Sequence, residues 1–234
     1  MKRMDSSFKT LVSIWIFVLI AAFVPFVQAE GGSIAVYVVD DAYVTFNSPN
    51  SNYGSEQILN VCLLHCFAWL KFDLSSIPEG AEGFTATLEL YTTANGVITP
   101  HDVVACLVQN NFNNTWTEET ITASNMPYLY DIELDTEYVA NNGTRYEWNV
   151  TEAVKAAVNN NSTLLTIFMR YSGAEGDDMS FKSKEGTLTQ MPKLTVSWAA
   201  VIPEYSLFII PMAMVTTLVV LFLKRRQSRI SSSY

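Results

Sequence analysis

Short runs of β-branched and aromatic residues recur about every ten residues through the middle of this chain, separated by clusters of Gly, Pro, Asn and Asp. In the runs at 67–72 and 84–92, apolar and polar residues alternate, which places one face of each predicted strand against a core. A helical repeat is visible at 151–158, where Thr151 is placed to act as the N-cap. We expect strands at 33–39, 42–46, 58–61, 67–72, 84–92, 103–109, 128–134, 144–148, 164–171, 179–182 and 193–199. This spacing predicts an all-β fold with the architecture of a β-sandwich.

The N-terminal segment has the features of a secretory signal peptide. Lys2, Arg3 and Lys9 precede an apolar run at 11–26, and Val27-Gln28-Ala29 follows with the small residues that signal peptidase accepts. A permanent membrane helix would also fit the length of this run. We expect cleavage after Ala29, which removes residues 1–29.

The C-terminal segment has the features of a membrane anchor. Residues 207–223 are apolar throughout, and Lys224, Arg225 and Arg226 follow at once. Because basic residues stay on the cytoplasmic side, this pattern predicts a transmembrane helix at 207–223 and a cytoplasmic tail at 224–234. The domain at 30–199 is then expected on the extracellular face of the cell membrane, joined to the helix by a short linker at 200–206.

Pro203-Glu204-Tyr205 in that linker resembles the archaeal C-terminal sorting signals of the PEF type, with Tyr where Phe is usual. Enzymes of the archaeosortase kind remove the helix from such tails and attach the protein to lipid. The resemblance implies an archaeal surface protein linked to lipid, and an unprocessed membrane helix is the alternative.

The predicted domain is strongly acidic. Between residues 30 and 199 the chain has seven Lys and Arg against 21 Asp and Glu, a net charge of −14, whereas the whole chain has a net charge of −9. Such a surface repels phosphate backbones, so we expect no binding to nucleic acid. Cations and uncharged glycans are the expected partners.

The three cysteines allow two disulfide pairings. Cys62 and Cys66 flank three residues and can close a hairpin tip, and a bridge between Cys66 and Cys106 is the alternative. A zinc site from Cys62, His65, Cys66 and His101 is disfavoured, because its spacing matches no standard finger and secreted thiols oxidise.

Five overlapping or neighbouring sequons lie in the second half of the domain, which favours a glycoprotein in a host with the necessary enzymes. The acceptor residues are Asn113, Asn142, Asn149, Asn160 and Asn161.

The order of short motifs along the domain resembles a known family. The motifs are Asp41-Ala42-Tyr43-Val44, Asn52-Tyr53-Gly54, Leu70-Lys71-Phe72-Asp73-Leu74, Trp116-Thr117-Glu118, Trp148-Asn149-Val150-Thr151, Phe181-Lys182-Ser183-Lys184-Glu185 and Pro192-Lys193-Leu194-Thr195-Val196. In this order they are similar to the DNRLRE-type domains, which are related to disaggregatase-associated repeats and to carbohydrate-binding modules of family 96.

The resemblance implies a jelly-roll β-sandwich that serves as a non-catalytic module on surface proteins, with a cell-surface or matrix polysaccharide as its partner. Two positions depart from the family pattern, because Ala123 stands where a second Trp is common and Lys184 replaces a frequent Arg. A family ligand contact that used that Trp would be altered here.

Aromatic faces and acidic side chains supply the candidate binding residues. Sugar recognition needs aromatic faces for stacking, and Trp69, Tyr53, Tyr91 and Trp116 are the candidates, with Trp69 expected to have an exposed face because it points away from Leu70. Jelly-roll modules often hold a structural calcium, for which Asp41, Asp73, Asp177 and Asp178 are the candidate ligands, although the sequence has no calcium-loop motif.

Catalysis is not expected. Glu118 and Glu119 are the most visible carboxylate pair, but adjacent residues on a strand point to opposite faces and cannot form the facing pair that glycosidases use. The favoured hypothesis is therefore a non-catalytic carbohydrate-binding or matrix-adhesion module. The alternatives are a structural envelope protein with no glycan ligand and a polysaccharide-cleaving enzyme of the disaggregatase kind.

Overall fold

The computed structural model describes residues 31–63, 65–97, 99–108, 115–127, 131–172 and 178–199. These residues belong to one compact unit, Gly31–Ala199. The predicted signal peptide at 1–29, linker at 200–206, transmembrane helix at 207–223 and tail lie outside them. Within the described part of the chain, no helix has both the length and the apolar character that crossing a membrane requires.

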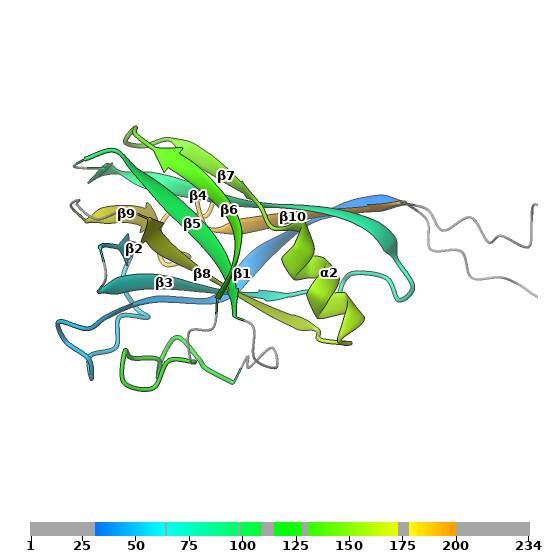
Figure 1. Cartoon of the computed structure of the whole chain (residues 1–234), viewed down its shortest axis with the longest axis horizontal. Coiled ribbons are helices and arrows are strands. Elements are labelled where there is room, and N and C mark those ends of the chain that lie inside the picture. The colour runs from blue at the N-terminus through cyan, green and yellow to red at the C-terminus, as the bar shows by residue number, and fades with distance from the viewer. Residues whose placement is uncertain are drawn as a thin grey trace, which may run out of the picture. The chain divides into compact units, whose positions relative to one another are not determined.

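Strands make up most of the described chain, which confirms the expected all-β fold (Figure 1). Helix is confined, within these residues, to α2 (Thr151–Asn159). The strands are β1 (Gly32–Thr45), β2 (Ile58–Val61), β3 (Cys66–Asp73), β4 (Glu82–Val97), β5 (His101–Val108), β6 (Asp131–Val139), β7 (Arg145–Asn149), β8 (Leu164–Ser172), β9 (Met179–Lys182) and β10 (Lys193–Ala199).

All the strand pairs are antiparallel, in the order β2-β9-β4-β10-β1-β3-β8-β5-β6, with β7 added beside β4. Strand β1 joins the two halves of this sheet because it changes partner along its length. Residues 32–37 pair with β10, and residues 38–45 pair with β3 after an irregularity between Val38 and Asp40. The sequence predicted two strands here, and the structure has one strand with a bulge, which bends the chain without ending the pairing.

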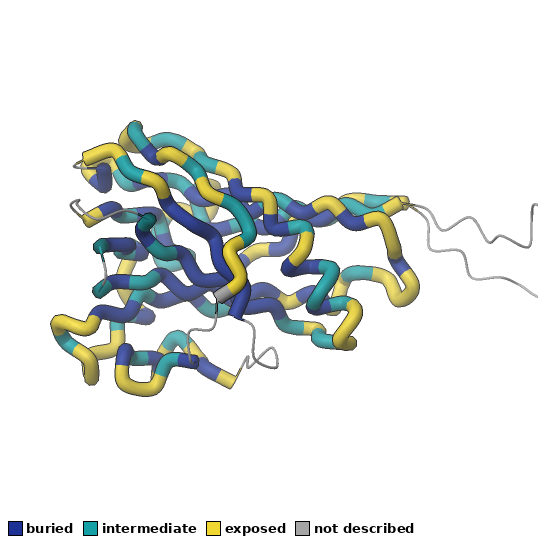
Figure 2. The backbone as a smooth tube through the Cα atoms, viewed as in Figure 1, coloured by how far each residue is buried: buried dark blue, intermediate teal, exposed yellow. Residues whose placement is uncertain are grey.

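The main core lies between the two halves of the sheet, an arrangement consistent with a β-sandwich. Leu70 and Phe72 of β3 and Leu88 and Leu90 of β4 are completely buried and belong to one apolar cluster, as their alternation predicted. Buried positions concentrate in the central strands, and exposed positions follow the connecting loops (Figure 2). Removal of these side chains from water is the main favourable contribution to folding.

A second apolar cluster covers the opposite face of β3, β5 and β8. Trp69 of β3 stacks on Phe168 of β8 with ring centroids 5.3 Å apart, and Trp116 packs edge-on against Trp69. Trp116, Ile121 and Ala123 come from the segment at 115–127, which lies over the sheet and closes this cluster. The expectation that Trp69 has an exposed face is therefore wrong, since it is 0 % exposed. The alternation in β3 correctly placed Trp69 on the face opposite Leu70, but the segment at 115–127 covers that face.

The helix begins differently from the prediction. Val150 is the N-cap, without a side-chain cap hydrogen bond, and Thr151 is the first helical residue. The Thr151 hydroxyl instead accepts a hydrogen bond from the Ala86 N–H of β4 at 2.9 Å. The expected N-cap role of Thr151 is therefore wrong, because a tertiary contact with the sheet uses its oxygen.

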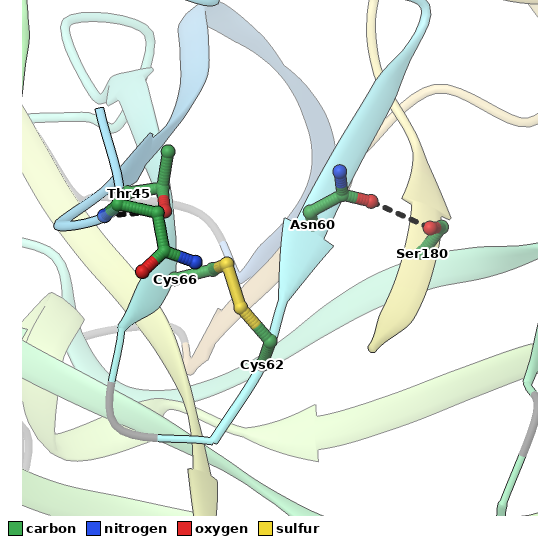
Figure 3. Close-up of a disulfide and its surroundings, with 6 residues drawn as sticks. Thr45, Asn60, Cys62, Cys66 and Ser180 are labelled. Atoms are coloured by element: carbon green, nitrogen blue, oxygen red, sulfur yellow. Dashed lines mark hydrogen bonds between the residues drawn. A yellow bond between two sulfur atoms is a disulfide. The ribbon is translucent and has the colours of Figure 1, made fainter. Parts of the chain in front are cut away.

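A disulfide closes the turn between β2 and β3. Cys62 and Cys66 form it with their Cα atoms 4.8 Å apart (Figure 3), which is the first of the two pairings that the sequence allowed. Cys106 is buried in β5 and is not part of this bridge. Zinc binds thiolates, and in this structure the sulfurs of Cys62 and Cys66 are joined to one another.

Candidate functional site

A cavity of about 480 Å³ opens on the outer side of β2, β9 and β4. The regular pairing of β4 with β9 is interrupted between Thr92 and Val97. The extra residues of β4 at 93–95 form part of the wall of the cavity. Bulges of this kind re-aim side chains beside functional sites. Most of the lining side chains carry amide, hydroxyl or charged groups: Gln57, Thr93, Asn95, Lys182, Glu185 and Thr187.

The outer face of β2 and β9 extends from this cavity. Ile58 pairs with Lys182 at the cavity, and two residues further along Asn60 pairs with Ser180, so all four lie on one face. The Ser180 hydroxyl donates to the Asn60 side chain at 2.6 Å (Figure 3). This row provides further hydrogen-bonding groups beside the cavity.

Tyr43 and Tyr53 form a stacked pair next to that row. Their ring centroids are 4.4 Å apart with an interplanar angle of 20°, and both side chains are half-buried. Burial, followed by the nearby Tyr53 and Glu56, raises the pKa of Tyr43, while its hydrogen bond with Asn60 opposes the shift. The Tyr43 phenol therefore stays neutral at physiological pH and keeps its O–H group.

The four predicted sugar-binding residues differ from one another in how far they are exposed. Trp69 is completely buried and Trp116 is 6 % exposed, so neither indole has a free face for a sugar. The Trp116 N–H donates to the Thr166 hydroxyl at 3.0 Å, which gives the side chain a packing role. Tyr53 and Tyr91 keep part of their surface exposed, and Tyr91 lies on β4 opposite Arg145 of β7.

Three carboxylates converge beside the cavity. Asp41 comes from β1, Glu118 from the segment at 115–127 and Glu185 from the loop between β9 and β10. One carboxylate oxygen from each lies within 4.8 Å of the other two. The Lys184 ammonium is 2.7 Å from Glu118 and 3.3 Å from Glu185. The backbone N–H of Lys184 donates to Asp41 Oδ2 at 2.9 Å. Because Glu185 also lines the cavity, this acidic cluster (Asp41, Glu118 and Glu185) adjoins it.

The electrostatics of the acidic cluster are unusual. Burial raises the pKa of Asp41 to about 8, opposed by the N–H of Lys184 and reinforced by Glu185. Burial lowers the pKa of Lys184, but the hydrogen bond and charge of Glu118, and then Glu185, raise it above its ordinary value overall. Lys184 therefore remains charged, while Asp41 holds a proton near neutral pH unless another cation approaches it.

The three described members of the predicted calcium set, Asp41, Asp73 and Asp178, do not form one cluster. Asp73 is exposed and accepts a hydrogen bond from the Ser75 N–H, and Asp178 lies beside Cys62, His65 and Cys66. Asp177 lies outside the described residues. Asp41 is in a cluster, but with Glu118 and Glu185, which sequence reasoning did not consider as metal ligands. Their positions in the motifs Trp116-Thr117-Glu118 and Lys184-Glu185 were the available signal.

Four of the five predicted glycosylation acceptors are exposed, namely Asn142, Asn149, Asn160 and Asn161, and Asn113 lies outside the described residues. The side-chain N–H of Asn142 donates to the Val97 carbonyl at 3.4 Å, and that of Asn160 to the Ala156 carbonyl at 2.7 Å. Attachment of a glycan to either nitrogen requires a change in these contacts.

The motif Asn52-Tyr53-Gly54 holds Glu118 in place. The Asn52 side-chain N–H groups donate to the carbonyls of Glu118 at 2.6 Å and Ile121 at 2.8 Å. Gly54 is buried against the Glu118 carbonyl, where an added Cβ would overlap backbone atoms.

We expect Gly54→Ala to lower the free energy of unfolding by about 1–3 kcal/mol, because this backbone contact leaves no room for a methyl group. Urea unfolding of the full-length chain measures the change, with the exposed neighbour Ser55→Ala as the matched control. Equal stability of the two variants would contradict the close packing of Gly54 against the segment at 115–127.

Comparison with known protein families gives one match that spans the strand-rich domain. Residues 33–198 match carbohydrate-binding module family 96. A search among curated proteins found no match. The family match covers more than half of the chain and runs from β1 to β10. The chain therefore belongs to carbohydrate-binding module family 96.

Proposed function

We propose that this protein is a non-catalytic cell-surface module that binds polysaccharide at the cavity beside β2, β9 and β4. Membership of a carbohydrate-binding family is the observation that carries the proposal. The cavity supports it, since its lining offers amides, hydroxyls and charged groups that can form hydrogen bonds with sugar hydroxyls.

The neighbouring surface favours an extended chain of sugars over a single one. The row formed by Asn60 and Ser180 continues from the cavity towards Tyr43 and Tyr53, which supply an aromatic surface for a sugar ring. The acidic surface of the domain disfavours polyanions of the nucleic-acid type. A neutral or weakly charged cell-surface or matrix polysaccharide is the ligand class that fits.

The proposal includes a jelly-roll form of the β-sandwich and a location on the extracellular face of the membrane. The partner change of β1 supports the first, because it joins two packed halves of antiparallel sheet. The second rests on the signal-peptide pattern at 1–29 and the apolar run with its basic tail at 207–234. In this view the chain is held by the membrane helix, or by lipid after sorting, and contributes to matrix adhesion.

The predicted absence of catalysis has support in the acidic residues themselves. Glu118 is ion-paired with Lys184, whereas its neighbour Glu119 is exposed. The two carboxylates therefore have separate environments. A binding role also accords with the family to which the chain belongs.

The test is binding of the full-length chain, purified in mild detergent, to arrays of glycans and surface polysaccharides. We expect saturable binding without release of sugar, and we expect Asn95→Ala and Lys182→Ala to weaken it about tenfold or more, since both side chains line the cavity. Asn159→Ala, at the exposed end of α2, is the matched control.

Absence of binding at high protein concentration would overturn the proposal and favour a structural envelope role. If glycan affinity is unchanged in both cavity variants but lost in Tyr53→Ala, the binding site is at the pair of Tyr43 and Tyr53 and not in the cavity. Release of oligosaccharides would contradict the non-catalytic assignment.

A further inference from the structure

The acidic cluster has a greater negative charge than its surroundings neutralise. Asp41, Glu118 and Glu185 meet one cationic side chain among the described residues, the ammonium of Lys184, which is ion-paired with Glu118 and Glu185. With Asp41 protonated the group carries one uncompensated negative charge, and with all three carboxylates ionised it carries two. Buried charge of this kind is costly unless a counter-ion compensates it.

The three carboxylates are close enough to share one cation. One oxygen from each of them lies within 4.8 Å of the other two. Oxygen ligands bind Ca²⁺ at about 2.3–2.6 Å, so two oxygens on opposite sides of the ion are about 4.6–5.2 Å apart. Mg²⁺ demands nearly ideal octahedral geometry and loses its water ligands reluctantly, so it suits such a site less well. Three carboxylates with water in the remaining positions are a donor set that suits calcium.

Two buried carboxylate oxygens at this place lack a hydrogen-bond donor among the described residues. Asp41 is 0 % exposed, and its Oδ1 makes no hydrogen bond within the described part of the chain. Glu185 Oε2 is likewise buried without a hydrogen-bond partner there. Almost all buried polar atoms in proteins have a partner, so oxygens of this kind indicate a ligand. Both belong to the group of converging carboxylates.

We propose that Asp41, Glu118 and Glu185 bind one calcium ion, and that the ion displaces the Lys184 ammonium from the cluster. The Lys184 side chain is 23 % exposed and flexible, so its ammonium can turn to solvent. The ion would connect β1, the segment at 115–127 and the loop after β9, three parts of the chain that are distant in sequence. This role concerns metal binding and local stability, and it does not depend on recognition of a sugar.

The first experiment titrates calcium alone into the full-length chain after treatment with a chelator, using calorimetry and thermal unfolding. We expect one saturable site with an affinity in the range of extracellular modules, a Kd of about 10⁻⁴–10⁻³ M, and a weaker response to Mg²⁺. We expect saturating calcium to raise Tm by about 5–10 °C. No saturable binding up to about 10 mM calcium would overturn the proposal.

Matched variants separate metal binding from a purely structural cluster. Glu185→Gln and Glu118→Gln keep the shape of the side chains, and each is expected to weaken calcium binding about tenfold or more. Glu119→Gln, at an exposed neighbouring position, is expected to leave it unchanged. An equal loss in Glu119→Gln and Glu185→Gln would contradict the assignment of ligands.

Lys184→Gln tests directly whether calcium displaces the Lys184 ammonium, because this variant lacks the competing positive charge. If calcium and Lys184 share one place, this variant binds calcium more tightly than the unmodified chain, whereas unchanged or weaker binding would contradict the displacement. Asp41→Asn serves where another variant fails to fold, since asparagine keeps the shape of the uncharged carboxyl group but cannot ionise to bind a cation. We expect it to stay folded in chelator and to lose the rise in Tm with calcium, and a retained rise would overturn the role of Asp41.

Discussion

Trp148→Ala is expected to lower the free energy of unfolding by about 3–5 kcal/mol, the largest single effect in this domain. Trp148 is 0 % exposed in the main core. Its indole N–H donates to the Val103 carbonyl of β5 at 2.9 Å, and its ring lies edge-on to Phe181 of β9 with centroids 5.9 Å apart. The alanine variant therefore leaves a large cavity and removes a buried hydrogen bond where β5, β7 and β9 meet.

Urea unfolding of the full-length chain measures this loss. Trp148→Phe is the matched variant, because it keeps the aromatic packing but removes the hydrogen bond, and we expect an intermediate loss. Trp198→Ala, at a half-buried position near the end of β10, is expected to cost less. A loss under about 1 kcal/mol for Trp148→Ala would contradict its central place in the core.

Asp40→Ala is expected to lower the free energy of unfolding by about 3 kcal/mol, because it leaves a buried cation without its counter-ion. The Lys71 ammonium is 2.7 Å from Asp40 Oδ2, and the two side chains are 5 % and 24 % exposed. Lys71 also donates to the Trp116 carbonyl and lies 4.4 Å from the centre of the Trp116 ring. These contacts join β3 to the segment at 115–127.

Substitution of the other partner, Lys71, is expected to lower the free energy of unfolding by less. Lys71→Met leaves Asp40, which water can reach, and fills the buried space with apolar atoms, so we expect a loss of about 1 kcal/mol. Both losses come from urea unfolding, and the double variant completes the thermodynamic cycle. Equal losses for the two single variants would show that the burial of Lys71 does not dominate the energetics of the pair.

Local pattern was sufficient for most strands. The alternation around Leu70 and Leu88 identified β3 and β4 and the faces that they bury, and β2, β9 and β10 begin and end where the sequence predicted. This pattern is reliable because successive side chains on a strand point to opposite faces, whatever the strand contacts elsewhere in the fold. The short helix was also identified, with a different residue at its N-cap.

Contacts between distant parts of the chain could not be predicted from the local sequence pattern. Trp69 was predicted to be exposed because nothing in β3 indicates that the segment at 115–127 covers its face. The acidic cluster joins residues 41, 118 and 185, and no spacing rule links them. The cavity likewise depends on a bulge in β4 whose neighbours, β2 and β9, are remote in sequence.

The orientation of β4 has a mechanical consequence. Its first residues pair with the end of β10, at Glu82 and Ala199, while the cavity lies at its far end around residues 93–95 (Figure 1). A pulling force between a ligand in the cavity and the C-terminal side of the domain would run along β4 and β10. Hydrogen bonds in an antiparallel pair are perpendicular to the strands, so this force would shear them together instead of opening them one by one. The pairing of β4 with β10 would therefore resist a force directed along these two strands.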